Sequence, residues 1–245
     1  VANVDLYDPS RDTWLARASL PFAVDDAAAA RAADGSIYVA GGIVTYQPYT
    51  AVATVERYDP TTDSWSTRAP MLTTRTDFSL VAAPDGKLYA IGGDTNSAYS
   101  GTVEAYDPST NQWTWRANLL PPARSVSAVL GPDGSIYAIG GTVNGSCCAT
   151  RVDVYDPSAD RWAPSTPLPI WTYGATAVGS GSNLYVLGGL DSGGGISGAV
   201  AHGTVCVAGA QSAGAPIPAR WARAGALTFH VFLPLISTSP ARVCA

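Results

Sequence analysis

A glycine doublet ends a short apolar run four times in this chain, at a nearly constant spacing. The steps between successive doublets are 51, 48 and 48 residues. A fixed period near fifty indicates a repeat architecture, in which each unit buries its apolar faces only by stacking on its neighbours. The doublets close almost the same phrase: SIYVAGG at 36–42, KLYAIGG at 87–93, SIYAIGG at 135–141 and NLYVLGG at 183–189.

A second phrase recurs out of phase with the first. Tyr-Asp-Pro occurs four times, and a Trp follows each Tyr by seven residues. Periodic aromatics of this kind supply the large apolar area that holds stacked repeats together. The pairs are Tyr7 and Trp14, Tyr58 and Trp65, Tyr106 and Trp113, and Tyr155 and Trp162.

Both phrases predict strands. The run before each doublet alternates in side-chain direction and is apolar on both faces, as in the inner strands of a covered sheet. A hairpin turn with positive φ precedes it, at Asp34-Gly35, Asp85-Gly86 and Asp133-Gly134, with Ser182-Asn183 in the fourth copy. The segment TVERYDPTTDSW at 54–65 predicts strand, tight turn and strand. Each period is therefore expected to form a four-stranded antiparallel meander.

The YDPxxxxW and IYxxGG phrases resemble those of the kelch repeat, over residues 1 to about 190. The resemblance implies an all-β fold, a kelch-type β-propeller in which each repeat forms one blade around a central channel. The repeated Tyr, Trp and Gly residues then belong to the scaffold rather than to a reactive site.

The phrases also predict the blade boundaries. Counting strands from the channel outward, residues 1–16 supply a third and a fourth strand without a first and a second. Full blades are expected at 23–67, 75–116 and 124–164, and residues 172–190 give another inner strand pair. The N-terminal pair could complete this last blade and close the ring.

The pattern weakens over residues 191–245, which we interpret as a degenerate half-blade and a C-terminal tail. Trp221-Ala222-Arg223-Ala224 is similar to the Trp-x-x-Arg-Ala of the earlier fourth strands. We expect four clear blades and a degenerate fifth in an incomplete ring, or a six-bladed parent cut at its N-terminus. Since Val1 falls inside a third strand, we expect a leader or earlier blades before it.

Charge and hydropathy exclude several partner classes. The net charge is −5, and Lys87 is the one lysine beside 13 arginines. No basic cluster is present to neutralise phosphates, so nucleic acid is not an expected partner. No apolar stretch is long enough for a membrane-spanning helix, so no membrane insertion is expected. We expect a monomer.

The pairing of the four cysteines would indicate the cellular compartment of the protein. Three pairings of Cys147, Cys148, Cys206 and Cys244 are formally possible, and free thiols are an equal alternative. A Cys206–Cys244 disulfide would hold the tail against the propeller and indicate an oxidising compartment, so we expect a secreted or cell-surface bacterial protein. The spacing fits no zinc site, and we expect neither a metal nor a cofactor.

Strand direction predicts where a ligand would bind. The loops after each Gly-Gly doublet and the loops that join blades should line one rim of the channel, and exposed aromatics beside Arg, Asp and Asn suit a peptide or a sugar. Arg75 and Arg124 have an alternative role in pairing with carboxylates of neighbouring blades. The candidate binding residues are Trp171, Tyr173, Arg75, Arg124, Asp77, Tyr46, Tyr49, Tyr99 and Asn96.

No catalytic constellation accompanies this rim. His202 and His230 both lie in the degenerate C-terminal region, in no ligand motif, and Asp25 and Asp26 are adjacent on a strand, so their side chains should diverge. We therefore expect a non-enzymatic recognition module that binds a protein or glycan partner. The alternatives are a propeller enzyme of the sugar-isomerase or oxidase type and a structural spacer of a longer surface protein.

Overall fold

The computed structural model describes residues 2–95, 98–143, 149–191, 193, 195–198, 200–204 and 220–223. Every regular element among these residues is a β-strand. No helix in this part of the chain is long and apolar enough to cross a membrane.

Sixteen of the described strands form four antiparallel sheets of four strands, each a meander that keeps its strands in chain order. Blade 1 contains β3 (Ala28–Arg31), β4 (Ile37–Ala40), β7 (Val55–Asp59) and β8 (Ser64–Arg68). Blade 2 contains β9 (Ser79–Ala82), β10 (Leu88–Ile91), β11 (Val103–Asp107) and β12 (Gln112–Arg116). Blade 3 contains β14 (Ser127–Leu130), β15 (Ile136–Ile139), β17 (Val152–Asp156) and β18 (Arg161–Pro164). Blade 4 contains β19 (Thr176–Ser180), β20 (Asn183–Leu187), β21 (Val200–Thr204) and β22 (Arg220–Arg223).

Three two-stranded sheets accompany the blades. The N-terminal hairpin pairs β1 (Val4–Asp8) with β2 (Thr13–Arg17). The loop after the first Gly-Gly doublet forms a hairpin of β5 (Ile43–Tyr46) and β6 (Tyr49–Ala51). At the start of blade 3, β13 (Ala123–Arg124) pairs with β16 (Thr142–Val143).

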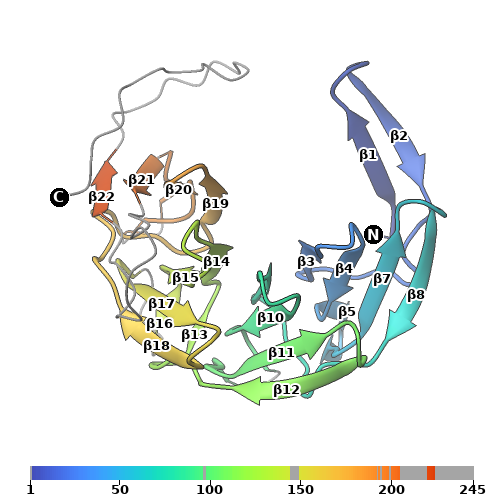
Figure 1. The fold of residues 1–245 in the computed structure, drawn as a ribbon, viewed down its shortest axis with the longest axis horizontal. Helices are drawn as coiled ribbons and strands as arrows, with labels where there is room; N and C mark the ends of the chain where they lie inside the picture. The colour runs from blue at the N-terminus through green and yellow to red at the C-terminus, as the bar shows by residue number, and fades with distance from the viewer. Residues whose placement is uncertain are drawn as a thin grey trace.

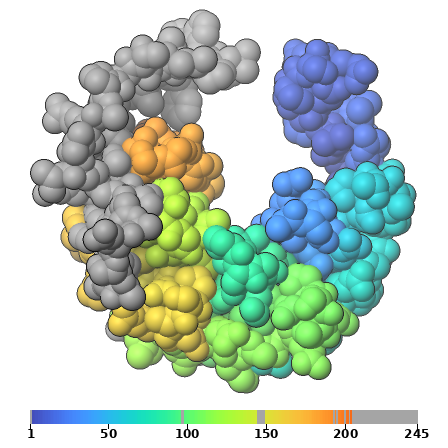
Figure 2. All heavy atoms as spheres, viewed as in Figure 1, coloured from blue at the N-terminus to red at the C-terminus, as the bar shows by residue number. Residues whose placement is uncertain are grey.

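The blades stand side by side around a common centre, which confirms the predicted propeller. Figure 1 shows β3, β14 and β19 nearest the centre and β8, β12 and β18 at the periphery. The described elements form an open arc, with the N-terminal hairpin beyond blade 1 at one end and blade 4 at the other. The space-filling view shows that the middle of the arc is open (Figure 2).

The region interpreted as a degenerate half-blade supplies the outer strands of blade 4. Strand β20 pairs with β21 and β21 pairs with β22, so the N-terminal hairpin does not complete this blade, as the sequence suggested it could. The register places Trp221 opposite Gly203, as Trp113 lies opposite Tyr106. In β22 the Arg follows the Trp by two residues, whereas it follows by three in the earlier fourth strands, so the similarity to their Trp-x-x-Arg-Ala rests on the Trp position.

The apolar core lies between the blades rather than within any one of them. Three clusters of buried side chains each span two adjacent blades. Within them, the Tyr of one blade's second strand contacts the Tyr of the next blade's third strand. The ring centroids are 5.6 Å apart for Tyr38 and Tyr106 and 5.5 Å apart for Tyr89 and Tyr155. Since no blade can bury both faces alone, adjacent blades stabilise one another.

The hairpin turns follow the prediction in three blades. Gly35, Gly86 and Gly134 have φ values of 88°, 81° and 82°, a region that favours glycine. In blade 4 the residue with positive φ is Gly181, at 57°. Ser182 precedes β20 and Asn183 begins it, so the turn lies one residue earlier than the sequence analysis placed it.

A repeated clamp joins the outer strands of neighbouring blades. In blade 2, Nε1 of Trp113 donates to the carbonyl oxygen of Ala69 at 2.9 Å, and Oδ1 of Asn111 accepts from the backbone N–H of the same Ala69 at 2.9 Å. The Tyr106 hydroxyl donates to that Oδ1 at 2.8 Å. Both backbone groups of one alanine at the end of β8 are thereby satisfied by the next blade.

Two further clamps have the same geometry. The clamp of Tyr58, Asp63 and Trp65 holds Ala18, and the clamp of Tyr155, Asp160 and Trp162 holds Ala117. The carboxylates of the Tyr-Asp-Pro turns have two different roles. Asp59 does accept from Thr61 within its turn, whereas Asp63 reaches across to the preceding strand pair.

We predict that Trp113→Phe destabilises the protein by about 1–3 kcal/mol, because the Ala69 carbonyl then lacks its donor in a buried contact. Urea unfolding measures the change. Trp115→Phe is the matched control, since Trp115 is exposed on the same strand and belongs to no clamp. It should change stability by less than about 0.5 kcal/mol. Equal effects of the two substitutions would contradict the role of the Nε1 donor.

Candidate functional site

One rim of the channel is built by a backbone pairing that repeats in every blade. The residues that follow each Gly-Gly doublet pair in antiparallel fashion with the residues that lead into the first strand. The loops that strand direction predicted to share one rim are therefore hydrogen-bonded to each other. The pairs are Asp25–Ile43, Thr76–Asp94, Arg124–Thr142 and Tyr173–Leu190.

The second glycine of each of the first three doublets connects this rim to the next blade. The N–H of Gly42 donates to the carbonyl of Arg75 at 2.9 Å, and that of Gly93 donates to the carbonyl of Ala123 at 3.0 Å. Gly42 has a φ of 94°, and a Cβ atom there would lie 2.5 Å from the carbonyl oxygen of Asp25. Only glycine fits this position without displacing the rim backbone.

The residue just before each first strand approaches the channel in a left-handed conformation. The φ values are 49° at Asp26, 53° at Asp77, 50° at Ser125 and 64° at Gly174. Asp is among the residue types that tolerate this region best. The N–H of Ser125 donates to the carbonyl of Asp77 at 2.8 Å, and that of Gly174 to the carbonyl of Ser125 at 3.4 Å. These four residues thus form a layer at the mouth of the channel.

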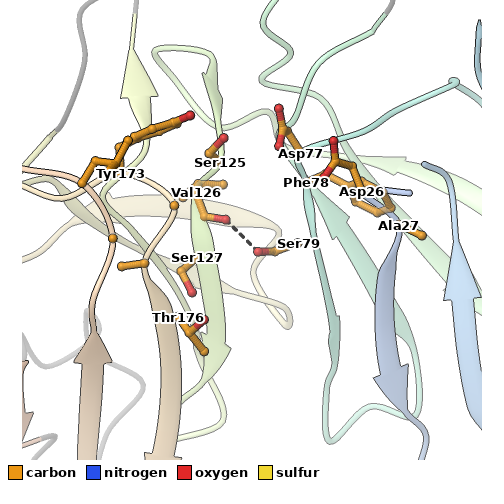
Figure 3. Close-up of a pocket in the computed structure, with 14 residues that line it drawn as sticks. Asp26, Ala27, Asp77, Phe78, Ser79, Ser125, Val126, Ser127, Tyr173 and Thr176 are labelled. Atoms are coloured by element: carbon orange, nitrogen blue, oxygen red, sulfur yellow. Dashed lines mark hydrogen bonds between the residues drawn. The ribbon is translucent and has the colours of Figure 1, made fainter. Parts of the chain in front are cut away.

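A hollow of about 720 Å³ opens at this layer, and we call this hollow the mouth. Figure 3 shows the Asp26 and Asp77 side chains beside each other, with the Tyr173 ring extending toward Ser125 on the opposite side. Below them, Oγ of Ser79 donates to the carbonyl of Val126 at 2.8 Å. The lining residues are Asp26, Ala27, Asp77, Phe78, Ser79, Ser125, Val126, Ser127, Tyr173, Gly174, Ala175, Thr176, Gly189 and Leu190.

The mouth is acidic. Partial burial, followed by the negative charges of Asp77 and Asp25, raises the pKa of Asp26 above its ordinary value. The sequence analysis expected Asp25 and Asp26 to diverge, and Asp26 indeed lines the hollow whereas Asp25 does not. The pairing of Asp26 with Asp77 could not be predicted from chain neighbours, because the two residues belong to different blades.

Two candidate tyrosines flank the mouth on the β5–β6 hairpin. The Tyr46 hydroxyl donates to Oδ2 of Asp25 at 2.6 Å, which raises the pKa of Tyr46 to about 12 and lowers the pKa of Asp25. Tyr49 contacts the Tyr46 ring edge-on, with centroids 6.5 Å apart. Desolvation, and then the charges of Asp94 and Asp77, raise the pKa of Tyr49. Both rings remain exposed at the rim.

Arg124 lies on the rim but is already engaged. Its Nη1 lies 3.3 Å from Oδ2 of Asp94. Its guanidinium group sits over the Tyr99 ring, 4.8 Å from the centroid. Arg124 begins blade 3, while Asp94 and Tyr99 belong to the blade 2 loop. The sequence analysis gave Arg124 either a ligand-binding role or this role between blades, and the structure places it in the second.

A family model for the kelch motif matches residues 27–72, 76–114 and 123–169, together more than half of the chain. The chain belongs to the kelch-repeat family. The three matches fall on blades 1, 2 and 3. The resemblance inferred from the two repeated phrases is therefore confirmed.

Similar regions occur in longer kelch proteins. The chain is 43% identical over 68 residues to human Kelch-like protein 33 and 38% identical over 91 residues to mouse Kelch-like protein 35. It is 36% identical over 96 residues to human Kelch repeat and BTB domain-containing protein 12. The matches cover 28%, 37% and 36% of this chain but 13%, 15% and 15% of those relatives.

Arg75 is buried and not at the exposed rim, so of its two predicted roles it has the second, pairing with a carboxylate, here Glu104. Both Arg75 and Glu104 have fully buried side chains, and Nη2 of Arg75 lies 2.6 Å from Oε1 of Glu104. Its Nη1 donates to the carbonyls of Gly92 and Thr102 at 2.8 and 2.9 Å. A carboxylate stands two residues before each repeated Tyr. In blade 2 this carboxylate, Glu104, holds the arginine inward within its own blade, whereas the prediction placed the pair between neighbouring blades.

The other candidates have mixed placements. Tyr173 lines the mouth, whereas Trp171 is 55% exposed and lies outside the lining. Asn96, Cys147, Cys148, Cys206, Cys244 and His230 lie outside the described residues, as does the side chain of His202. The Cys206–Cys244 disulfide, the secreted location and the bacterial origin stay predictions. No group of three or more His, Cys, Asp or Glu residues in the described part of the chain is placed to hold a metal ion.

Several mouth residues were missed by the sequence analysis. Ser125, Ser127 and Thr176 line the hollow, and Ser127 also accepts from the N–H of Ala177 in blade 4 at 2.8 Å. A signal was present in the repeat. Ser125 occupies the position that Asp77 has in the preceding repeat, Ser127 that of Ser79, and Thr176 that of Ser127. Aligning the repeats at the first strand as well as at the doublet would have found them.

We predict that Arg75→Met destabilises the protein by about 3–5 kcal/mol, because the buried Glu104 carboxylate is left without its partner. Denaturant unfolding measures the loss. The double variant Arg75→Met with Glu104→Gln should recover part of it, since no buried charge then remains. A loss below about 1 kcal/mol in the single variant would contradict a structural role for the pair.

We predict that Asp26→Asn slightly stabilises the protein at neutral pH. A raised folded-state pKa means that ionised Asp26 disfavours the folded state above that pKa. Removing the charge should raise stability by less than about 1 kcal/mol, since the group is exposed. The gain should vanish below the ordinary Asp pKa of 3.8, where both states hold the proton. Thermal unfolding from pH 3 to 8 tests this, with Asp5→Asn on β1 as control.

Proposed function

We propose that this kelch propeller is a non-enzymatic recognition module whose mouth binds a cationic segment of a protein partner. The observation that carries the proposal is the pairing of Asp26 with Asp77 at the mouth. Among the described residues that line it there is no Lys, Arg or His side chain. Two like charges held together disfavour the empty state and favour a ligand that neutralises them.

The pairing of the nearby arginines also favours a cationic ligand over an anionic one. Arg75 is buried against Glu104, and Arg124 is paired with Asp94. Neither offers an unpaired guanidinium group to a carboxylate ligand. The charged groups that the mouth offers to a partner are therefore the carboxylates of Asp26 and Asp77.

The size and chemistry of the mouth suit a side chain rather than a whole domain. A hollow of about 720 Å³ is comparable to small-ligand sites. A Lys ammonium or Arg guanidinium group between Asp26 and Asp77 would form charge-assisted hydrogen bonds. The exposed faces of Tyr46 and Tyr49 on the neighbouring hairpin would add cation–π attraction to the same segment.

We predict that the full chain binds a Gly-Lys repeat decapeptide and not the matched Gly-Glu peptide, as measured by isothermal titration calorimetry. Asp26→Asn and Asp77→Asn should each weaken binding by roughly 10-fold or more, since each removes one charged hydrogen-bond acceptor. Asn tolerates the left-handed backbone at both positions, so the fold should be retained.

Asp5→Asn is the control and should leave the affinity unchanged, because Asp5 is not among the residues that line the mouth. Binding that is equal for both peptides, or that survives both mouth substitutions, would contradict the proposal. Retention of a neutral glycan by both variants would assign the rim to carbohydrate instead.

A further inference from the structure

The mouth has two sides of different chemistry. Asp26 of blade 1 and Asp77 of blade 2 stand beside each other on one side, and the Tyr173 ring extends from the other (Figure 3). Tyr173 lies in the segment that leads into blade 4. Two backbone hydrogen bonds, of 2.9 and 3.2 Å, pair it with Leu190, which therefore lies on the same side. A charged side thus faces an aromatic and aliphatic side across one hollow.

The apolar side is the part of the lining where a ligand can reach large apolar side chains. Four of the described lining residues are apolar and larger than alanine. Phe78 and Val126 are buried, whereas Tyr173 and Leu190 are partly exposed. Their neighbours in the lining are Gly174, Ala175 and Gly189, which add no side chain larger than a methyl group. The surfaces of Tyr173 and Leu190 are therefore the ones that an apolar group in the mouth would contact.

The backbone layer at the mouth sets the distance between the two sides. Ser125 N–H donates to the Asp77 carbonyl, and Gly174 N–H donates to the Ser125 carbonyl. Backbones joined in this way lie about 5 Å apart, so Asp77 and Gly174 are roughly 10 Å apart. Residues i and i+2 of an extended peptide point in the same direction, about 6.6 Å apart. The Tyr173 ring covers the remaining distance, because it extends toward Ser125 (Figure 3).

A ligand gains most from the mouth when it uses both sides at once. A cation alone would neutralise the carboxylates of Asp26 and Asp77 but leave the apolar side in contact with water. An apolar group alone would bury surface against Tyr173 and Leu190 but leave the two like charges unpaired. A segment that carries both groups, at the spacing of i and i+2, satisfies both sides.

We propose that the segment bound at the mouth carries a Lys or Arg and, two residues away, a large apolar side chain that packs on Tyr173 and Leu190. The inference rests on the proposed function, because it names the residue that accompanies the cation. The two carboxylates select the charge of the ligand, and Tyr173 selects its apolar neighbour. Trp171, on the same segment but outside the lining, has no part in this selection.

The test compares Gly-Ser octapeptides that contain one Lys and differ at one further residue. Isothermal titration calorimetry of the full chain should show about 10-fold tighter binding when Phe, rather than Ala, stands two residues after the Lys, because Phe buries more apolar area. Tyr173→Ala should reduce this preference to less than about 3-fold without weakening the Ala peptide. Trp171→Ala is the matched control and should keep the full preference, since Trp171 is exposed outside the lining.

A third peptide tests the spacing on the unmodified protein. With Phe five residues from the Lys, it should bind like the Ala peptide. Equal binding of all three peptides, each weakened by Asp26→Asn, would overturn this inference and leave the proposed function intact. A preference for Phe that survives Tyr173→Ala, or that is the same at both spacings, would also overturn it. Binding that Asp26→Asn leaves unchanged would contradict the proposed function, and this inference with it.

Discussion

The structure depends on one contact, in which a Trp and an Asp or Asn of one blade hold both backbone groups of a residue in the preceding blade. In blade 2 this residue is Ala69, held by Trp113 and Asn111. A strand edge at the periphery would otherwise leave these groups to water. The aromatic rings add apolar burial at the same point, so the clamp fixes both the distance and the orientation of neighbouring blades.

That spacing in turn positions the mouth. The clamps act at the outer strands, while the Gly-Gly doublets join the same blades at the rim through bonds such as Gly42 N–H to the carbonyl of Arg75. With blades fixed at both places, residues from separate repeats meet at the centre. Asp26 and Asp77 are brought together in this way, and their mutual repulsion is sustained by the scaffold.

The same geometry separates the residues that hold the scaffold from those that differ between repeats. The mouth carries side chains that vary between repeats, with Asp in blades 1 and 2 and Ser or Gly in blades 3 and 4. The clamps carry side chains that differ little between blades, because each holds the same two backbone groups of an alanine. In the function that we propose, the mouth selects its partner by charge.

The sequence by itself determined the repeat, the strands, the propeller and the family, because period and local turn chemistry are written in neighbouring residues such as Tyr155, Asp156 and Trp162. It also predicted that Tyr173 and Asp77 lie at one rim. Only the tertiary structure decided that Arg75 is buried, that Arg124 is held by Asp94, and that Asp26 faces Asp77. Such pairings join residues of different strands or blades, and their partners are set by register and packing angle, which no local pattern encodes.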